Sequence, residues 1–125
     1  MKILMVCLGN ICRSPLAEGI MRYKLKQLGL DWFVDSAGVG HWHAGEQPDK
    51  RSIAKAAEHG IDINYQRARQ ITTSDLNDFD LILTMDMTNY RSVLQLAQHP
   101  QHEAKVQMIR NFRQGNMNLL IIKYL

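Results

Sequence analysis

The chain has 125 residues, the size of a single domain. Hydrophobic residues make up 46% and charged residues 22%, a balance typical of globular proteins, and the 8 Gly, 3 Pro and 2 Cys exclude collagen-like and disulfide-packed chains. The net charge is +3, and the basic residues form no run of five or more, so we expect no nucleic acid as a partner. A small anionic substrate fits this mild positive charge.

The apolar stretches of the sequence are short. The longest, at residues 3–8 and 119–122, are far below the roughly 20 residues that span a bilayer. The apolar segment at the start meets Gly9 after a few residues, too early for a signal peptide. We therefore expect a cytoplasmic protein with no membrane partner. In a reducing compartment, two cysteines are more often reactive than structural.

Apolar runs alternate with amphipathic segments along the chain. In order, the sequence predicts strand, helix, strand, helix, strand, helix and strand at residues 2–7, 15–28, 32–34, 48–59, 79–85, 88–99 and 105–109. A glycine-rich loop at 36–45 follows the second strand, and a short extended piece at 67–71 and a turn at Ser74 are expected before the third. Strands that alternate with helices predict a parallel α/β sheet, in which ligands bind beyond the carboxyl ends of the strands.

The sharpest motif lies between the first strand and the first helix, at one of these carboxyl ends. Cys7 is followed by five residues and then by Arg13 and Ser14. Five intervening residues can form a loop with inward backbone N–H groups, and such a ring at a helix N-terminus binds a tetrahedral oxyanion. Arg13 adds a planar charged fork that suits phosphate, and a positive field of this kind favours a thiolate. The motif therefore predicts a phosphate site with Cys7 as the nucleophile.

Several residues near this loop have two interpretations. Cys7 is either the nucleophile or a buried strand cysteine. Ser14 is either a helix cap or a hydroxyl that donates to Cys7, and the two roles are compatible. Asn10 suits a left-handed backbone conformation, from which its side chain could pin the loop. Arg69 either lies on a solvated edge or helps to position the loop.

The loop and its surroundings resemble a known family. Residues 6–18, VCLGNICRSPLAE, resemble the phosphate-binding loop of the low-molecular-weight protein tyrosine phosphatases. Later stretches that resemble the same family are DSAGVGHWHAG at 35–45, HGI at 59–61, ARQI at 68–71, and DLILTMD at 80–86 with Asn89. The resemblance runs from residue 1 to about 113. Its motifs are specific, because the similarity extends well beyond the cysteine and the arginine.

The resemblance implies a fold and a reaction. The fold is a single-domain, three-layer α/β/α structure with a central four-stranded parallel sheet. The reaction is two-step hydrolysis of phosphotyrosine in proteins, or of aryl phosphates, in which Cys7 attacks phosphorus and forms a phosphocysteine. Charge stabilisation comes from Arg13 and backbone amides, so neither a metal nor a cofactor is implied.

The resemblance also assigns roles to the residues around the nucleophile. The phosphate oxygens are held by Arg13 and by the amides of the loop, which are those of Leu8, Gly9, Asn10, Ile11, Cys12 and Arg13. Asn10, Ser14 and Ser36 maintain the loop and the thiolate. Trp42 lines the entrance and packs against an aryl ring.

Cys12 has two interpretations as well. The resemblance implies a reversible disulfide between Cys12 and Cys7 that protects the nucleophile from over-oxidation. Alternatively, Cys12 is a small residue that fills the loop. We expect no metal site, because the two cysteines have no histidine nearby and His41 and His43 would have to fold over them.

The resemblance fails toward the C-terminus. The family's general acid is an aspartate in an Asp-Pro-Tyr-Tyr-like loop, which protonates the leaving phenolate and later activates water. The last aspartate here is Asp86, and only Glu103 follows it among acidic residues, so we find no general acid. A general acid typically contributes roughly 10²–10⁴-fold, so reduced activity is expected.

Two explanations of this departure stay open. Residues 1–125 form a single phosphatase domain that is C-terminally truncated relative to the family, whose last helix is also absent. The chain is then either a natural variant specialised for binding or the product of a frameshift or truncation. The apolar tail at 119–125 either covers the sheet face left exposed or pairs with another chain, which predicts possible self-association.

Three functions remain as alternatives. The first is a tyrosine phosphatase impaired by its C-terminus. The second is a module that binds phosphate or phosphopeptides without turnover. The third is a thiol-linked arsenate reductase, which shares the fold and loop but needs downstream cysteines. None follows Cys12 in this sequence.

Overall fold

Four parallel strands form the centre of the structure, a computed structural model that describes residues 1–112. Along the chain the elements are β1 (Lys2–Cys7), α1 (Arg13–Leu28), β2 (Phe33–Gly38), α2 (Lys50–Glu58), α3 (Thr73–Asp78), β3 (Leu81–Thr84), α4 (Met87–Leu94), α5 (Pro100–Lys105), β4 (Val106–Met108) and a 3-10 turn at Ile109–Phe112. The tail at 119–125, with its predicted cover or self-association, lies outside the described residues.

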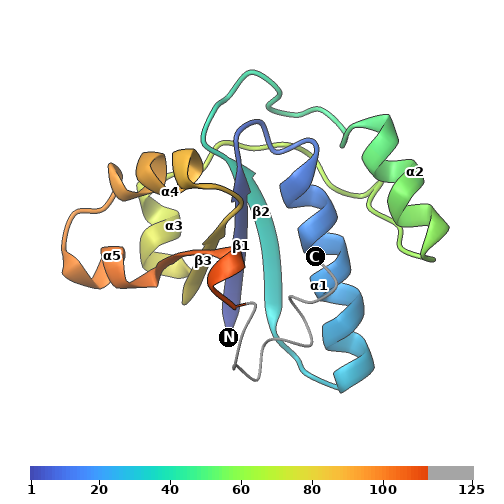
Figure 1. Cartoon of the computed structure of the whole chain (residues 1–125), viewed down its shortest axis with the longest axis horizontal. Coiled ribbons are helices and arrows are strands. Elements are labelled where there is room, and N and C mark those ends of the chain that lie inside the picture. Colours follow the sequence, from blue (N-terminus) through green and yellow to red (C-terminus); the bar gives the residue numbers. More distant parts are fainter. Residues whose placement is uncertain (113–125) are drawn as a thin grey trace.

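The strand order is β2-β1-β3-β4, so β1 lies inside the sheet (Figure 1). Ile3 pairs with Val34 on one side and with Leu81 on the other. The first strand is apolar along nearly its whole length because both of its faces and both of its edges are covered. Its last residue, Cys7, pairs with Gly38 at the carboxyl edge of the sheet.

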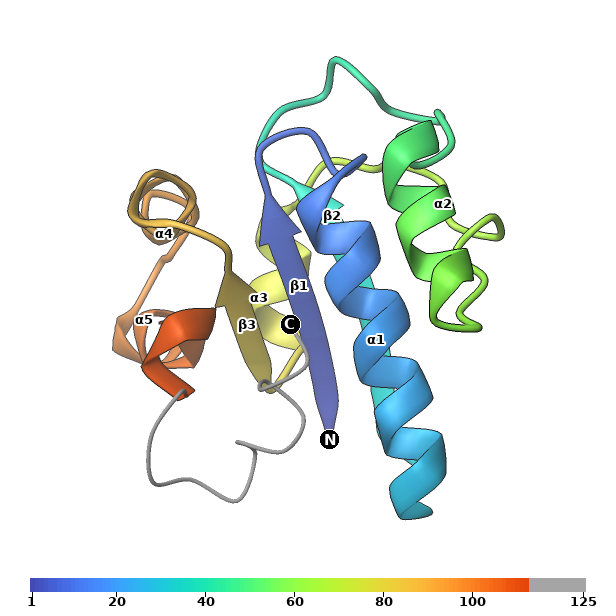
Figure 2. The ribbon, with the colours of Figure 1, turned by 45° about the vertical axis from the view of Figure 1, so that its right-hand side comes forward.

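Helices cover both faces of this sheet (Figure 2). On one face, α1 packs Ala17, Met21 and Leu25 against the strands. On the other face, Leu76 of α3 and Val93 of α4 close a second buried cluster. The predicted three-layer α/β/α fold with a four-stranded parallel sheet is confirmed.

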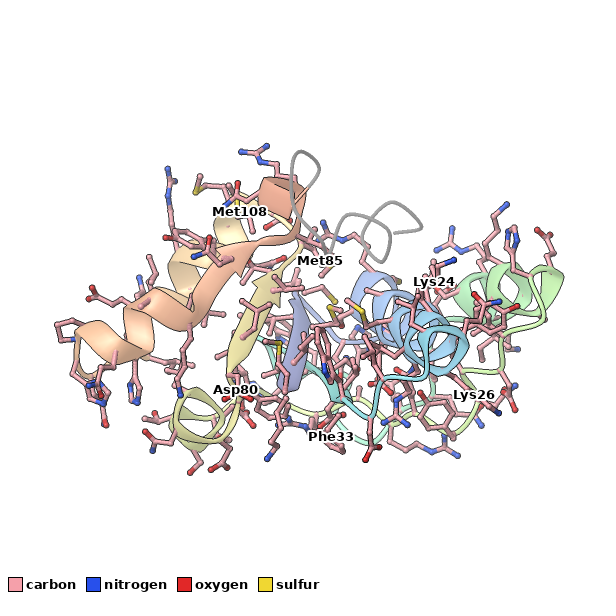
Figure 3. All side chains as sticks on the ribbon, turned by 90° about the horizontal axis from the view of Figure 1, so that it is seen from below. Lys24, Lys26, Phe33, Asp80, Met85 and Met108 are labelled. Atoms are coloured by element: carbon pink, nitrogen blue, oxygen red, sulfur yellow. The ribbon has the colours of Figure 1, made fainter. Side chains whose placement is uncertain are left out.

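The two ends of the sheet differ in character. At the end where the strands begin, the rings of Phe33 and Phe79 lie 6.1 Å apart, and the backbone N–H of Lys2 donates to Asp80 at 2.8 Å (Figure 3). At the carboxyl end, β1 runs into the loop that leads to α1. Polar side chains from distant parts of the chain gather around that loop.

Some predicted elements have different bounds. The second strand continues to Gly38, past the predicted end at Val34. Residues 88–99 do not form one helix: α4 ends at Leu94, and Pro100 occupies the first turn of α5. Only a turn was predicted near Ser74, whereas Thr73–Asp78 is a helix.

The start of α1 also differs from the sequence prediction. The helix begins at Arg13, with Cys12 in the N-cap position and no side-chain cap. Ser14 therefore lies inside the first turn, and its hydroxyl is directed to other partners. Within residues 1–112, no helix is long and apolar enough to cross a membrane.

Candidate active site

The loop from Leu8 to Cys12 connects β1 to α1 at the carboxyl edge of the sheet (Figure 1). Neighbouring backbone holds it on two sides. The N–H groups of Val39 and Gly40 donate to the carbonyls of Cys7 and Leu8 at 2.9 and 2.8 Å, and the N–H of Asp49 donates to the carbonyl of Ile11 at 2.6 Å. The loop is therefore fixed before any ligand binds.

Asn10 lies at the centre of the loop with a φ of 59°. Its side chain is buried and contacts three segments. Oδ1 accepts the backbone N–H of Arg69 at 2.9 Å, and Nδ2 donates to the hydroxyls of Ser14 and Ser36 at 2.9 and 3.0 Å. The structure thus brings together three residues that the sequence analysis grouped as loop support.

Cys7 and Ser14 lie side by side beneath the loop. Sγ of Cys7 is 3.0 Å from Oγ of Ser14, and both residues are buried. Because Ser14 also accepts from Asn10, its own proton is available to Cys7. A hydroxyl in this position stabilises a thiolate more than a thiol.

Arg13 lies at the rim and is paired with a residue that the sequence analysis did not single out. Its guanidinium donates to Oδ2 of Asp86 at 3.0 Å, and both side chains are about half exposed. The N–H of Asn89 lowers the pKa of Asp86, and Arg13 adds to this effect. The sequence signal for Asp86 as a site residue is its position just after β3. The carboxyl ends of parallel strands meet at one edge of the sheet, where the loop also lies.

Beneath the loop, Glu18 joins the serine and asparagine network. Its carboxylate accepts from Ser36 at 2.8 Å and from Tyr65 at 2.6 Å, and Arg22 lies 3.1 Å away. Burial raises the pKa of Glu18, and these three partners oppose that effect. Gln66 donates to the carbonyl of Pro15 at 2.9 Å and ties the segment to α1.

Arg69 supports the loop from the other side. Its guanidinium contacts Asp35 at 3.1 Å and Asp75 at 3.0 Å, while its backbone N–H holds Asn10. The interpretation of Arg69 as a residue that positions the loop fits this geometry better than that of a solvated edge.

Trp42 lies on the rim, 65% exposed, with its ring against Gly40. A pocket of about 380 Å³ opens beside it. Its lining residues come from the loop, from the segment after β2, from the segment before α3, and from α4 and the residues that follow it: Leu8, Val39, Gly40, Trp42, Gln70, Ile71, Ser92, Gln95 and Leu96.

Both cysteines are free thiols, Cys7 buried and Cys12 half-buried. Burial raises the pKa of Cys12, and the charges of Asp49 and Cys7 add to this effect. Within residues 1–112, no three His, Cys, Asp or Glu side chains gather where they could hold a metal ion. The prediction about the general-acid loop concerns residues 113–125, which lie outside the described part of the chain.

Comparisons with known proteins identify a family to which the chain is similar. The family model for low molecular weight phosphotyrosine protein phosphatase matches residues 2–121. Low molecular weight phosphotyrosine protein phosphatase 2 of Drosophila melanogaster is 41% identical over 112 residues, covering 88% of this chain and 67% of the relative. The enzyme of Sus scrofa is 37% identical over 113 residues, covering 88% of this chain and 71% of the relative.

A solved structure, the protein tyrosine phosphatase of Entamoeba histolytica, superposes with a TM-score of 0.87 at 35% identity, covering 93% of this chain and 74% of that one. The parallel sheet and the cysteine-to-arginine loop at its carboxyl edge define a phosphatase whose phosphate loop begins with a cysteine. The chain belongs to the low molecular weight phosphotyrosine protein phosphatase family. The resemblance stated from the sequence is thereby confirmed.

Proposed function

We propose that residues 1–125 form one phosphatase domain that hydrolyses phosphotyrosine in proteins, with Cys7 as the nucleophile. The observation that carries the proposal is the contact of 3.0 Å between Sγ of Cys7 and Oγ of Ser14, at the base of a preformed loop. We also propose a cytoplasmic location, because a nucleophilic thiol needs a reducing compartment.

Substrate binding uses charge that the loop already presents. The amides of residues 8–13 and the start of α1 attract the phosphate oxygens. Arg13 exchanges its carboxylate partner, Asp86, for two phosphate oxygens, a switch that costs little because the ion pair is half exposed. The aryl ring lies at the rim beside Trp42, whose side chain is open to solvent.

The reaction has two displacement steps at phosphorus. In the first, Sγ of Cys7 bonds to phosphorus while the bond to the phenolic oxygen breaks, and the leaving group departs as a phenolate that takes a proton from the solvent. In the second, water attacks phosphorus, the P–S bond breaks, and Ser14 stabilises the thiolate that returns. Arg13 and the amides hold the equatorial oxygens in both steps.

Asp86 is committed to Arg13 and to the N-terminus of α4, so we do not propose it as the general acid of the reaction. A general acid typically contributes roughly 10²–10⁴-fold, and most for substrates with poor leaving groups.

Rapid-mixing kinetics with p-nitrophenyl phosphate test the proposal. Its leaving group departs with little help, so we expect a burst that approaches one product per chain, followed by a slow phase. Cys7→Ser abolishes the burst, whereas Cys12→Ser keeps it. A folded chain with no burst that still binds phosphopeptides would instead be a binding module without turnover.

A further inference from the structure

The pocket beside Trp42 is continuous with the phosphate loop. Leu8 lines it and directly follows Cys7 in the chain. The N–H of Val39, another lining residue, donates to the carbonyl of Cys7 at 2.9 Å. The N–H of Gly40, which also lines the pocket, donates to the carbonyl of Leu8 at 2.8 Å. A ligand whose phosphate binds in the loop therefore has this pocket directly beside it.

The inner lining of the pocket is apolar and belongs to the core. Ile71 is buried, and Val39 and Leu96 pack against the same buried cluster. These three side chains come from the segments after β2, before α3 and after α4. Because close-packed core residues hold this lining, the pocket of about 380 Å³ exists before a ligand binds. Its volume falls within the range typical of ligand pockets.

Two large apolar side chains of the pocket are open to solvent. Leu8 is 51% exposed, and Trp42 is more exposed still. Exposed apolar side chains that adjoin one another around a pocket indicate a surface that is covered when a partner binds. Burying them against an apolar group of the substrate would contribute about 25 cal/mol for each Å² of apolar surface removed from water.

The polar groups of the pocket are uncharged. They are the amides of Gln70 and Gln95 and the hydroxyl of Ser92, and the other lining residues within the described part of the chain are apolar or glycine. Nε2 of Gln70 donates to the carbonyl of Val39 at 3.1 Å, which fixes this amide at the wall. Amides and hydroxyls can bond the backbone of a bound peptide, but they cannot offset the cost of desolvating a charged side chain. The pocket therefore favours an uncharged group.

The side of the loop toward α2 has a different character. There, Asp49 contacts the loop, because its N–H donates to the carbonyl of Ile11. Its carboxylate pairs with Arg51 at 3.2 Å, and the arginine is exposed. The helices α2 and α4 lie on opposite sides of β1 (Figures 1 and 2). A substrate therefore meets charged side chains toward α2 and the uncharged pocket toward α4.

We propose that this pocket receives an uncharged, apolar side chain that adjoins the phosphotyrosine of a protein substrate. The Cα atoms of adjacent residues are about 3.8 Å apart, so a residue next to phosphotyrosine comes to the edge of the pocket when the phosphate enters the loop. The inference rests on the proposed function and names the class of phosphotyrosine site that is preferred. One neighbour of the phosphotyrosine is apolar, and the other is free to carry a charge.

Phosphotyrosine peptides test this preference. Each peptide places leucine or glutamate either directly before or directly after the phosphotyrosine, with alanine elsewhere. The measurement is kcat/KM from the release of phosphate, and the burst amplitude with p-nitrophenyl phosphate gives the concentration of active chains in each sample. At one of the two positions we expect leucine to exceed glutamate by about tenfold, and at the other by less than about twofold.

A matched pair of variants assigns the preference to this pocket. Gln95 lines the pocket at the end of α4, and Gln98 lies three residues further along the chain; both are exposed, so neither substitution disturbs the core. Gln95→Lys brings a cation to the pocket, where it attracts glutamate. We expect the leucine-to-glutamate ratio to fall by about tenfold in this variant. Gln98→Lys adds the same charge nearby and keeps the ratio of the natural chain.

The outcomes separate the inference from the proposed function. Equal kcat/KM for leucine and glutamate at both positions overturns the inference and leaves the proposed function standing. A leucine-to-glutamate ratio that is the same in Gln95→Lys and Gln98→Lys also overturns it, because the preference then arises outside the pocket. Absence of a Cys7-dependent burst with p-nitrophenyl phosphate in the natural chain overturns the proposed function itself.

Discussion

Of the two roles that the sequence suggested for Ser14, the structure shows the contact with Cys7 and not the helix cap. Ser14 lies in the first turn of α1 and is fully buried, with its hydroxyl between Asn10 and Cys7. A hydrogen bond to a charged group is worth about 1.5–3 kcal/mol. If Cys7 reacts as a thiolate, this hydroxyl is therefore a large part of what stabilises it.

For Ser14→Ala we expect the burst rate with p-nitrophenyl phosphate to fall by about 10- to 100-fold. The thiolate loses its donor, and Nδ2 of Asn10 loses an acceptor. The measurement is the burst rate at saturating substrate. Ser74→Ala, at an exposed position on α3, serves as the control and keeps the natural rate. An unchanged rate in Ser14→Ala would reduce Ser14 to a packing residue.

At this scale, sequence reasoning found the residues that are close together in the chain. Cys7, Asn10, Arg13 and Ser14 lie within eight positions, and their spacing alone states the chemistry. Their partners are far away in sequence, because Asp86 reaches Arg13 across 73 positions. No local pattern marks such a partner. Only the rule that parallel strands end at one edge pointed toward it.

The second strand shows how one element positions another. β2 runs to Gly38, which pairs with Cys7 on one side. On its other side, Gly38 forms backbone hydrogen bonds with Arg69 and Ile71. A Cβ on Gly38 would lie 2.8 Å from the carbonyl oxygen of Leu8 and 3.0 Å from the backbone nitrogen of Asn10. These are backbone atoms of the phosphate loop, so they cannot rotate out of the way.

We therefore expect Gly38→Ala to push the loop away from the strand. Overpacking of this kind costs about 1–3 kcal/mol of folding free energy, and here the burst rate falls as well. Gly60→Ala is the matched control: its φ of 73° imposes about 1–2 kcal/mol of strain, but nothing lies within 4 Å. Urea unfolding and burst kinetics on both variants separate strain from loop displacement. Equal burst rates would contradict the expectation.

The elements that the sequence predicted poorly are the short ones. Pro100 suggested the end of a helix, yet proline also fits the first turn of a new one, and here it opens α5. Thr72 and Asp75 form a capping box at the start of α3. The sequence analysis missed this helix because six residues carry only a weak apolar pattern. The long strands and helices carry enough periodicity to be predicted, whereas one-turn helices depend on their caps and on tertiary packing.

At the scale of the whole molecule, one buried network joins the site to the fold. Glu18 of α1 accepts from Ser36 of β2 and from Tyr65 of the segment after α2. Ser36 in turn accepts from Asn10. The same carboxylate therefore helps to hold the loop and ties a helix, a strand and a connecting segment together. Its charge state matters for stability and for the site at once.

Burial raises the pKa of Glu18 above its ordinary value of 4.5, so the folded chain binds this proton more tightly than the unfolded chain does. The free energy that Glu18 contributes to folding is fully present below pH 4.5 and is lost as the pH rises through the folded pKa. Glu18→Gln removes this loss. Its free energy of unfolding, minus that of the natural chain, should therefore increase as the pH rises from 4 to 7, whatever other groups titrate. Urea unfolding across this range gives the difference directly. A difference that stays constant, or that decreases, would show that Tyr65, Ser36 and Arg22 compensate fully for burial of the carboxylate.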